Sequence, residues 1–115
     1  MYKKIYSKLK ENKLNPYPIG GHRGECKEDY CVIKEGTQVP TINTNKLGYK
    51  RIDIILFIPI GSYIEVEDYA KEIRKAMQEL KFLRKTGAET PIVVDDEKKA
   101  YTMSIEYQVM KKLEG

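Results

Sequence analysis

The sequence predicts an α+β protein with the element order αββαββ, in which a four-stranded, mainly antiparallel sheet packs on helices. Two segments place apolar residues at the helical period of 3.6, and two strand candidates alternate apolar with polar residues. The connection between the last two strand candidates is short, which favours a hairpin and antiparallel pairing. Because 115 residues are one domain's length, residues 1–115 are expected to form a single domain.

The first element is expected to be an amino-terminal helix. Its apolar residues fall at positions i, i+3, i+4 and i+7, and they are Tyr2, Ile5, Tyr6 and Leu9. The helix should end within residues 12–18, which contain two prolines. The segment of about residues 14–28 also holds three glycines, and this composition predicts an irregular connection that is mobile or is ordered by a partner.

Two strands should follow, separated by a long polar loop. Tyr30–Lys34 is a short strand candidate, and residues 35–48 are polar enough to predict a second mobile loop. The strongest strand candidate is Tyr49–Ile58, whose even-numbered apolar residues should face the core: Ile52, Ile54, Leu56 and Ile58.

The other face of this strand candidate changes character along its length. It begins with the polar residues Arg51 and Asp53 and ends with the apolar residues Ile55 and Phe57. Apolar side chains on the outer face of a sheet need a cover, so we expect self-assembly or docking there.

A second helix is expected after this strand. Ser62 and Glu65 have the spacing of a capping box, in which both side chains satisfy free backbone donors of a starting helix. An apolar stripe of period 3.6 follows, formed by Val66, Tyr69, Ala70, Ile73, Met77 and Leu80. The helix should fade within residues 81–86, before Gly87.

Two strand candidates complete the chain. Pro91–Asp95 is short, and the charged residues after it predict a turn. The last strand alternates, with one apolar face formed by Tyr101, Met103, Ile105, Tyr107 and Val109.

Composition excludes several classes of protein. The longest apolar run, residues 54–60, is far shorter than the roughly 20 residues of a membrane helix and contains a proline, so no membrane partner is expected. The first residues carry lysines without an apolar stretch behind them, and this pattern predicts no signal peptide and a location in a cytoplasm. Cys26 and Cys31 are expected to be free thiols.

The sequence offers weak candidates for chemistry. His22, Cys26 and Cys31 match no zinc-ligand spacing and lack a fourth ligand, and the glycines of residues 20–24 lack the strand and helix that flank a phosphate loop. A nuclease site built from Asp53, Glu97 and Lys99 would need these side chains to converge on one cation. We therefore expect no enzyme activity, no metal and no cofactor.

The excess of positive charge belongs to the first helix. Lysine and arginine exceed the acidic residues by 4 in the whole chain. Five lysines and one glutamate in residues 3–13 supply the same excess, 5 − 1 = 4. A basic helix face is usually solvated, but it also fits an acidic protein surface or nucleic acid. The candidate partner or assembly surface therefore consists of Lys3, Lys4, Lys8, Arg51, Asp53, Ile55 and Phe57.

Three segments resemble a family of phage proteins. Residues 48–59, 63–74 and 104–107 are similar to the tail-terminator or tail-completion (head-tail joining) proteins, which are minor structural proteins of tailed bacteriophages and prophages. The resemblance covers most of residues 1–110 and consists of patterns of apolar alternation.

This resemblance implies a non-enzymatic homo-oligomeric ring, often a hexamer, that caps the tail tube. Its partners would be copies of itself, the tail-tube protein and the head connector, with DNA passing through the ring. It would occupy the virion, after assembly in the host cytoplasm. The alternative is a small cytoplasmic nucleic-acid-binding or regulatory protein that uses the basic first helix.

Overall fold

The sheet has more strands than the sequence predicts. A computed structural model describes residues 2–40 and 47–112, with two helices and a six-stranded sheet. The helices are α1 (Tyr2–Glu11) and α2 (Tyr63–Gln78), and the strands are β1 (Pro16–Pro18), β2 (Tyr30–Pro40), β3 (Leu47–Pro59), β4 (Arg84–Glu89), β5 (Val93–Asp95) and β6 (Ala100–Lys112). The α+β class is confirmed, and the sheet has six strands instead of the expected four.

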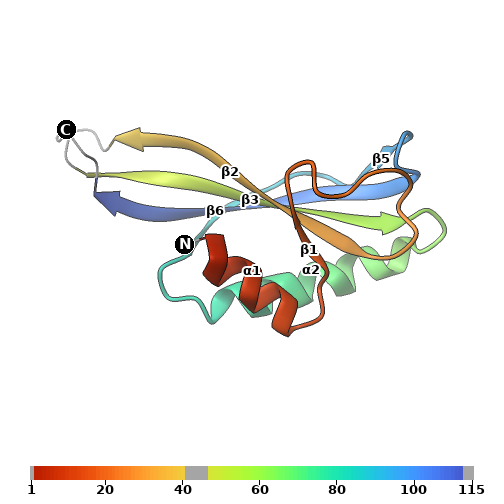
Figure 1. Ribbon diagram of the computed structural model, residues 1–115, viewed down its shortest axis with the longest axis horizontal. Coiled ribbons are helices and arrows are strands. Elements are labelled where there is room, and N and C mark those ends of the chain that lie inside the picture. The colour runs from red at the N-terminus through yellow and green to blue at the C-terminus, as the bar shows by residue number, and fades with distance from the viewer. Residues whose placement is uncertain (1, 41–46, 113–115) are drawn as a thin grey trace.

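The strand order is β1-β2-β3-β6-β4, and β5 also pairs with β6. Every pair is antiparallel except β1 with β2. Both helices lie on one face of the sheet, and the long strands β2, β3 and β6 extend beyond them as an arm (Figure 1). The molecule is accordingly elongated, measuring 48 × 26 × 24 Å.

The two strands that the sequence did not predict, β1 and β4, lie at the edges of the sheet. β1 contains two prolines, which lack a backbone donor and are tolerated on an edge strand. β4 is polar and exposed along most of its length, so it has no apolar alternation that would indicate a strand. Both strands form through backbone hydrogen bonds, and neither has the apolar alternation of a strand that packs on the core.

Part of the predicted loop 35–48 is strand. β2 continues to Pro40 and β3 begins at Leu47, while residues 41–46 lie outside the described residues. The register between β2 and β3 shifts between Glu35 and Gln38. Gly36 allows this irregular pairing, because a Cβ at this position would lie only 3.2 Å from the Cβ of Arg51. The prediction of a loop was wrong here, because the backbone hydrogen bonds of a strand do not depend on apolar side chains.

The main core lies between the helices and the sheet, on the face that the alternation predicts. Ile52, Ile54, Leu56 and Ile58 of β3 are each 0% exposed. They pack with Ile5 and Leu9 of α1, with Val66, Ile73 and Met77 of α2, and with Met103 and Ile105 of β6. The Tyr69 hydroxyl donates a hydrogen bond to the backbone carbonyl of Leu14, which ties α2 to the chain that follows α1.

The ends of α2 differ from the prediction. Ser62 is the N-cap residue, but its side chain makes no capping hydrogen bond, so the capping box is wrong. Its φ of −114° and ψ of 41° depart from the extended backbone of a typical N-cap, and its backbone carbonyl accepts a hydrogen bond from the Glu65 N–H at 2.9 Å. The helix ends at Gln78, and Leu80 packs on the core from the following turn.

A strap, defined as residues 19–29, crosses the sheet on the face opposite the helices (Figure 1). The Cys26 N–H donates to the backbone carbonyl of Lys98 at 2.7 Å, and the Lys98 ammonium donates to the backbone carbonyl of His22 at 3.2 Å. An ion pair of 3.2 Å joins Glu25 to Lys99. The strap is therefore fixed to the turn that immediately precedes β6.

Candidate assembly surfaces

The predicted surface residues divide between two faces of the molecule. Lys3, Lys4 and Lys8 are on α1, which packs on one face of the sheet. The β3 residues Arg51, Asp53, Ile55 and Phe57 alternate with the buried residues of the same strand, so they point to the opposite face. The structure does not bring these two groups together, and they are two separate surfaces.

The lysines of α1 are partly engaged by the protein itself. Lys3 and Lys4 are exposed, and the Lys4 ammonium lies 5.8 Å from the centre of the Phe82 ring. Lys8 pairs with Glu79 at 3.3 Å and with Glu11 at 3.7 Å, and these contacts raise the pKa of Lys8, chiefly through Glu79. Lys3 and Lys4 are thus better placed than Lys8 to meet a partner.

The outer face of the sheet has a charged row beside its apolar part. Asp53 lies opposite Lys34 of β2 on one side and opposite Glu106 of β6 on the other. Partial burial raises the pKa of Asp53, and the neighbouring Glu106 carboxylate raises it further, while Lys34 and Arg51 oppose the shift. This part of the face is polar enough to contact a hydrated partner.

The strap covers the apolar end of the outer face, which the sequence left open. The Phe57 ring stacks on Tyr30 with 4.8 Å between ring centres, and the Tyr30 ring stacks on His22 at 3.8 Å. The Tyr17 ring meets both His22 and Tyr30 edge-on. Phe57 is therefore packed against the protein's own chain. Ile55, which lies two residues before Phe57 in β3, remains half-buried.

His22 occupies a poor environment for a positive charge. Its Nδ1 atom is buried and has no hydrogen-bond partner among the described residues. Burial lowers the pKa of His22 below its ordinary value, and the nearby Lys98 ammonium lowers it further, while Glu28 opposes this shift. The neutral imidazole is the form that fits the stack with Tyr30.

Stability is expected to fall between pH 7 and pH 5, in part through His22. The unfolded chain binds a proton on His22 near pH 6.5, whereas the folded protein resists it, so acidification favours unfolding. Urea titrations at both pH values would measure the loss. The variant His22→Gln should show a smaller loss than the wild type, and an equal loss in both proteins would contradict this assignment.

The candidate residues for chemistry do not converge. Cys31 packs in the helix-side core, whereas Cys26 belongs to the strap and packs on the other face of the sheet, and both thiols are free. Burial raises the pKa of Cys26 to about 11 and that of Cys31 to about 12. In the part of the chain that the structure describes, no group of His, Cys, Asp or Glu side chains could hold a metal ion.

The nuclease candidates are also far apart. Glu97 lies in the turn between β5 and β6, and Lys99 immediately precedes β6. Asp53 is six residues before the end of β3, which corresponds to about 20 Å along the strand. Asp53 and Glu97 therefore do not share a cation site.

Sequence reasoning missed an apolar surface, the end patch, at the end of the molecule where α2 begins. It consists of Tyr63 and Val94, both at least half exposed. Val93 is also exposed, but it pairs with Thr102 and points to the opposite face of the sheet from Val94. The Tyr63 ring meets the Tyr101 ring edge-on at 5.2 Å, and Val94 pairs with Tyr101 across β5 and β6. Ile64 is 83% exposed but lies on the side of α2 opposite its buried residues, so it does not belong to this surface.

A second surface, the basic groove, lies between α2 and the strands β4 and β6. It has a volume of about 450 Å³ and is lined by Lys71, Arg74, Lys75, Met77, Gln78, Leu83, Lys85 and Tyr107. Met77, Leu83 and Tyr107 are buried and form its apolar floor, whereas Lys71, Lys75 and Lys85 are exposed at its rim. The sequence could not predict this groove, because β4 had no strand pattern.

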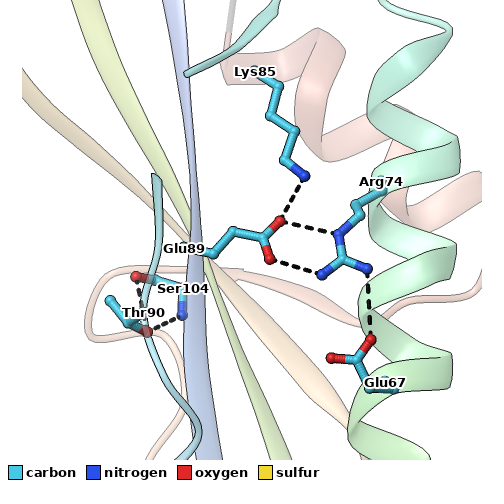
Figure 2. A network of polar contacts seen from close by, with 6 residues as sticks. All are labelled: Glu67, Arg74, Lys85, Glu89, Thr90 and Ser104. Carbon is cyan, nitrogen blue, oxygen red and sulfur yellow. Dashed lines mark hydrogen bonds and ion pairs between the residues drawn. The ribbon is translucent and has the colours of Figure 1, made fainter. Parts of the chain in front are cut away.

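Ion pairs fix one side of the basic groove (Figure 2). The Arg74 guanidinium donates two hydrogen bonds to the Glu89 carboxylate, at 2.8 and 3.0 Å, and Lys85 pairs with the same carboxylate at 2.7 Å. Glu67 lies 3.7 Å from the other side of Arg74. The contacts with Arg74 and Lys85 lower the pKa of Glu89, chiefly through Arg74. Helix α2 is thereby joined to the edge strand β4.

The substitution Glu89→Gln is expected to lower the free energy of unfolding at pH 7 by about 1–2 kcal/mol, because it weakens a bidentate, charge-assisted contact. The lowered pKa means that this stabilisation is present at neutral pH and is lost as Glu89 is protonated in acid. Urea denaturation measures the change. The exposed control Glu72→Gln should change stability by less than about 0.5 kcal/mol. Similar losses in both variants would contradict the role of Glu89.

Comparison with known proteins identifies no family for this chain. No family model matches it, and a search of curated proteins finds no match. Neither helix of the described residues is long and apolar enough to cross a membrane. The function is therefore inferred from the surfaces of the molecule.

Proposed function

We propose that this protein is a non-enzymatic structural component of a tailed phage or prophage, which assembles as a ring of identical copies at the tail end or the head-tail junction. The observation that carries the proposal is the end patch. Tyr63 and Val94 expose apolar side chains beside the Tyr101 ring, and exposed apolar side chains that lie together favour a contact with another protein. The resemblance to tail-terminator proteins supplies the kind of assembly.

The open edge of β2 supports contacts with further partners. β1 pairs only with Cys31–Ile33, so the backbone of β2 from Lys34 to Pro40 pairs with β3 alone among the described strands. Such an edge can accept a strand from another protein. This stretch belongs to the arm, which reaches beyond the helices (Figure 1). In the proposed particle it would meet the tail-tube protein or the head connector.

The outer face of the sheet suits the wall of a channel. It presents Lys34, Arg51, Asp53 and Glu106 next to one another on three adjacent strands. Mixed charge keeps such a surface hydrated, and it would let DNA pass without holding the phosphates tightly. The proposal therefore includes DNA in transit and assigns the protein no catalysis or cofactor.

The proposal is tested by the size and shape of the purified protein. Light scattering during size-exclusion chromatography, from micromolar to millimolar concentration, should show a species of several subunits. Negative-stain electron microscopy should show closed rings with a central opening. A protein that stays monomeric at every concentration would contradict the proposed ring.

The alternative, a nucleic-acid-binding protein, is favoured by the exposed lysines of α1. Lys3 and Lys4 are exposed, and the first turn of the helix contains no acidic residue. This function requires a shift of duplex DNA mobility that weakens steeply with salt. The shift should disappear in the variant Lys3→Gln/Lys4→Gln and persist in the strap control Lys27→Gln. A shift that both variants retain would rule out α1 as the binding surface.

A further inference from the structure

Positive charge is concentrated on the side of α2 that borders the basic groove. The four α2 residues at its rim follow the spacing i, i+3, i+4 and i+7, and they are Lys71, Arg74, Lys75 and Gln78. Among the residues that the structure describes, no acidic side chain lines this groove. Several acidic residues of α2 line a different cavity instead, which Lys71 also borders: Glu65, Asp68 and Glu72. The groove is therefore the basic side of a helix whose charges are segregated.

Two cations of the groove are already paired within the chain. The Arg74 guanidinium is held by Glu89 and Glu67, and Lys85 shares the Glu89 carboxylate (Figure 2). The ion pairs of the described residues engage neither Lys71 nor Lys75. These two lysines lie one helical turn apart, where like charges repel each other. Bound carboxylates would relieve this repulsion.

The floor of the groove asks for an apolar group. Met77, Leu83 and Tyr107 are 1%, 9% and 4% exposed, and they line a volume of about 450 Å³. Ligand sites commonly have volumes of about 300–1,000 Å³ and pair an apolar lining with a few polar groups. The complementary occupant is apolar where it meets this floor and negatively charged where it meets the rim.

The spacing of the two lysines fits an extended chain. Lys71 and Lys75 are four residues apart, which corresponds to about 6 Å along the helix axis. In an extended chain, alternate residues are about 6.6 Å apart and point to the same side, while the residue between them points to the other side. The edge strand β4 also borders the groove and pairs only with β6 among the described strands, and such an edge can accept an extended segment.

We propose that the basic groove binds an extended acidic segment of another protein, in which an apolar residue lies between two acidic residues. The two carboxylates meet the ammonium groups of Lys71 and Lys75, and the apolar side chain packs on the floor formed by Met77, Leu83 and Tyr107. This inference goes beyond the proposed ring, because it names a contact with a different protein and the groove is complete within one copy.

A synthetic peptide tests the binding. The probe is a fluorescein-labelled nonapeptide of serine and glycine with glutamate, leucine and glutamate at its centre. Its fluorescence anisotropy should rise as the whole protein is added, up to millimolar concentration. One control peptide has glutamine in place of both glutamates, and the other has serine in place of leucine. Each control should bind about tenfold more weakly than the probe, because it lacks either the charge or the apolar anchor.

The variant Lys71→Gln/Lys75→Gln locates the site. Both side chains are exposed, so circular dichroism should show a folded protein, and its affinity for the probe should fall about tenfold. The matched control is Lys3→Gln/Lys4→Gln, which removes the same charge from two exposed lysines of α1. This control should bind the probe as tightly as the wild type.

Several outcomes would overturn the inference. They are no binding of the probe at any concentration, an equal loss in both lysine variants, and a serine-substituted peptide that binds as tightly as the probe. A DNA duplex that binds the wild type and loses affinity only in Lys71→Gln/Lys75→Gln would assign the rim to nucleic acid instead. A wild-type oligomer that this variant dissociates, as measured by light scattering, would make another copy the occupant.

The same measurements separate this inference from the proposed function. A protein that stays monomeric at every concentration but binds the probe through Lys71 and Lys75 supports the groove and contradicts the ring. A ring that does not bind the probe leaves the proposed function standing and overturns the groove as a site for acidic segments.

Discussion

Replacing Ile54 with alanine is expected to lower the free energy of unfolding by about 3–4 kcal/mol, whereas the same change at Ile55 should cost about 1 kcal/mol. Ile54 is 0% exposed and packs in the core beneath the helices. Ile55 is its neighbour in β3 but points to the outer face, where it is half-buried. Truncation of Ile54 leaves a cavity in the core, whereas the side chain of Ile55 is already partly exposed to water.

Urea denaturation of both variants at pH 7 measures this difference. The pair is well matched because residue type, strand and change are the same, and only the face differs. Equal losses in the two variants would contradict the assignment of faces in β3. Ile55→Ala also probes the outer face as an assembly surface, since a change in subunit number without a large loss of stability would place a partner there.

The sequence predicted the elements that bury apolar side chains. The alternation in β3 and β6 and the stripe of α2 identified the core face correctly, because burial selects residue type at every second or every third to fourth position. Tyr69 and Tyr107 were correctly placed in the core on the same grounds. These positions specify where the helices pack.

The edge elements were not predictable in this way. β1, β4 and the second half of β2 form through backbone pairing, and their residues are polar, exposed or proline. The basic groove depends on β4, so it was missed with that strand. The end patch depends on β5 lying close to the start of α2, a contact between segments about 30 residues apart that no local pattern encodes.

The strap changes the interpretation of the outer sheet face. Phe57 was expected to need an external partner, but Tyr30 stacks on it from within the chain, and His22 and Tyr17 pack in turn against Tyr30. This cover could not be predicted, because prolines and glycines indicate an irregular segment without indicating which surface it crosses. Of the predicted outer-face residues, Arg51, Asp53 and Ile55 remain candidates for contact with a partner.

The substitution Tyr30→Ala is expected to lower the free energy of unfolding by about 3–5 kcal/mol and to release the strap. Tyr30 is 1% exposed and is the central ring between His22 and Phe57. Its removal leaves the strap without its aromatic support, although the contacts of Lys98 with His22 and Cys26 remain. We therefore expect the strap to be destabilised more than the helix-side core.

Tyr30→Phe is the matched control. The Tyr30 hydroxyl is buried without a hydrogen-bond partner among the described residues, so its removal should leave stability unchanged or slightly increased. Urea denaturation compares the two variants globally, and limited trypsin digestion compares them in the strap, where Arg23 and Lys27 are exposed. Under conditions where both proteins are folded by circular dichroism, cleavage at these sites should be fast in Tyr30→Ala and slow in Tyr30→Phe. Equal cleavage rates would show that the aromatic stack does not hold the strap on the sheet.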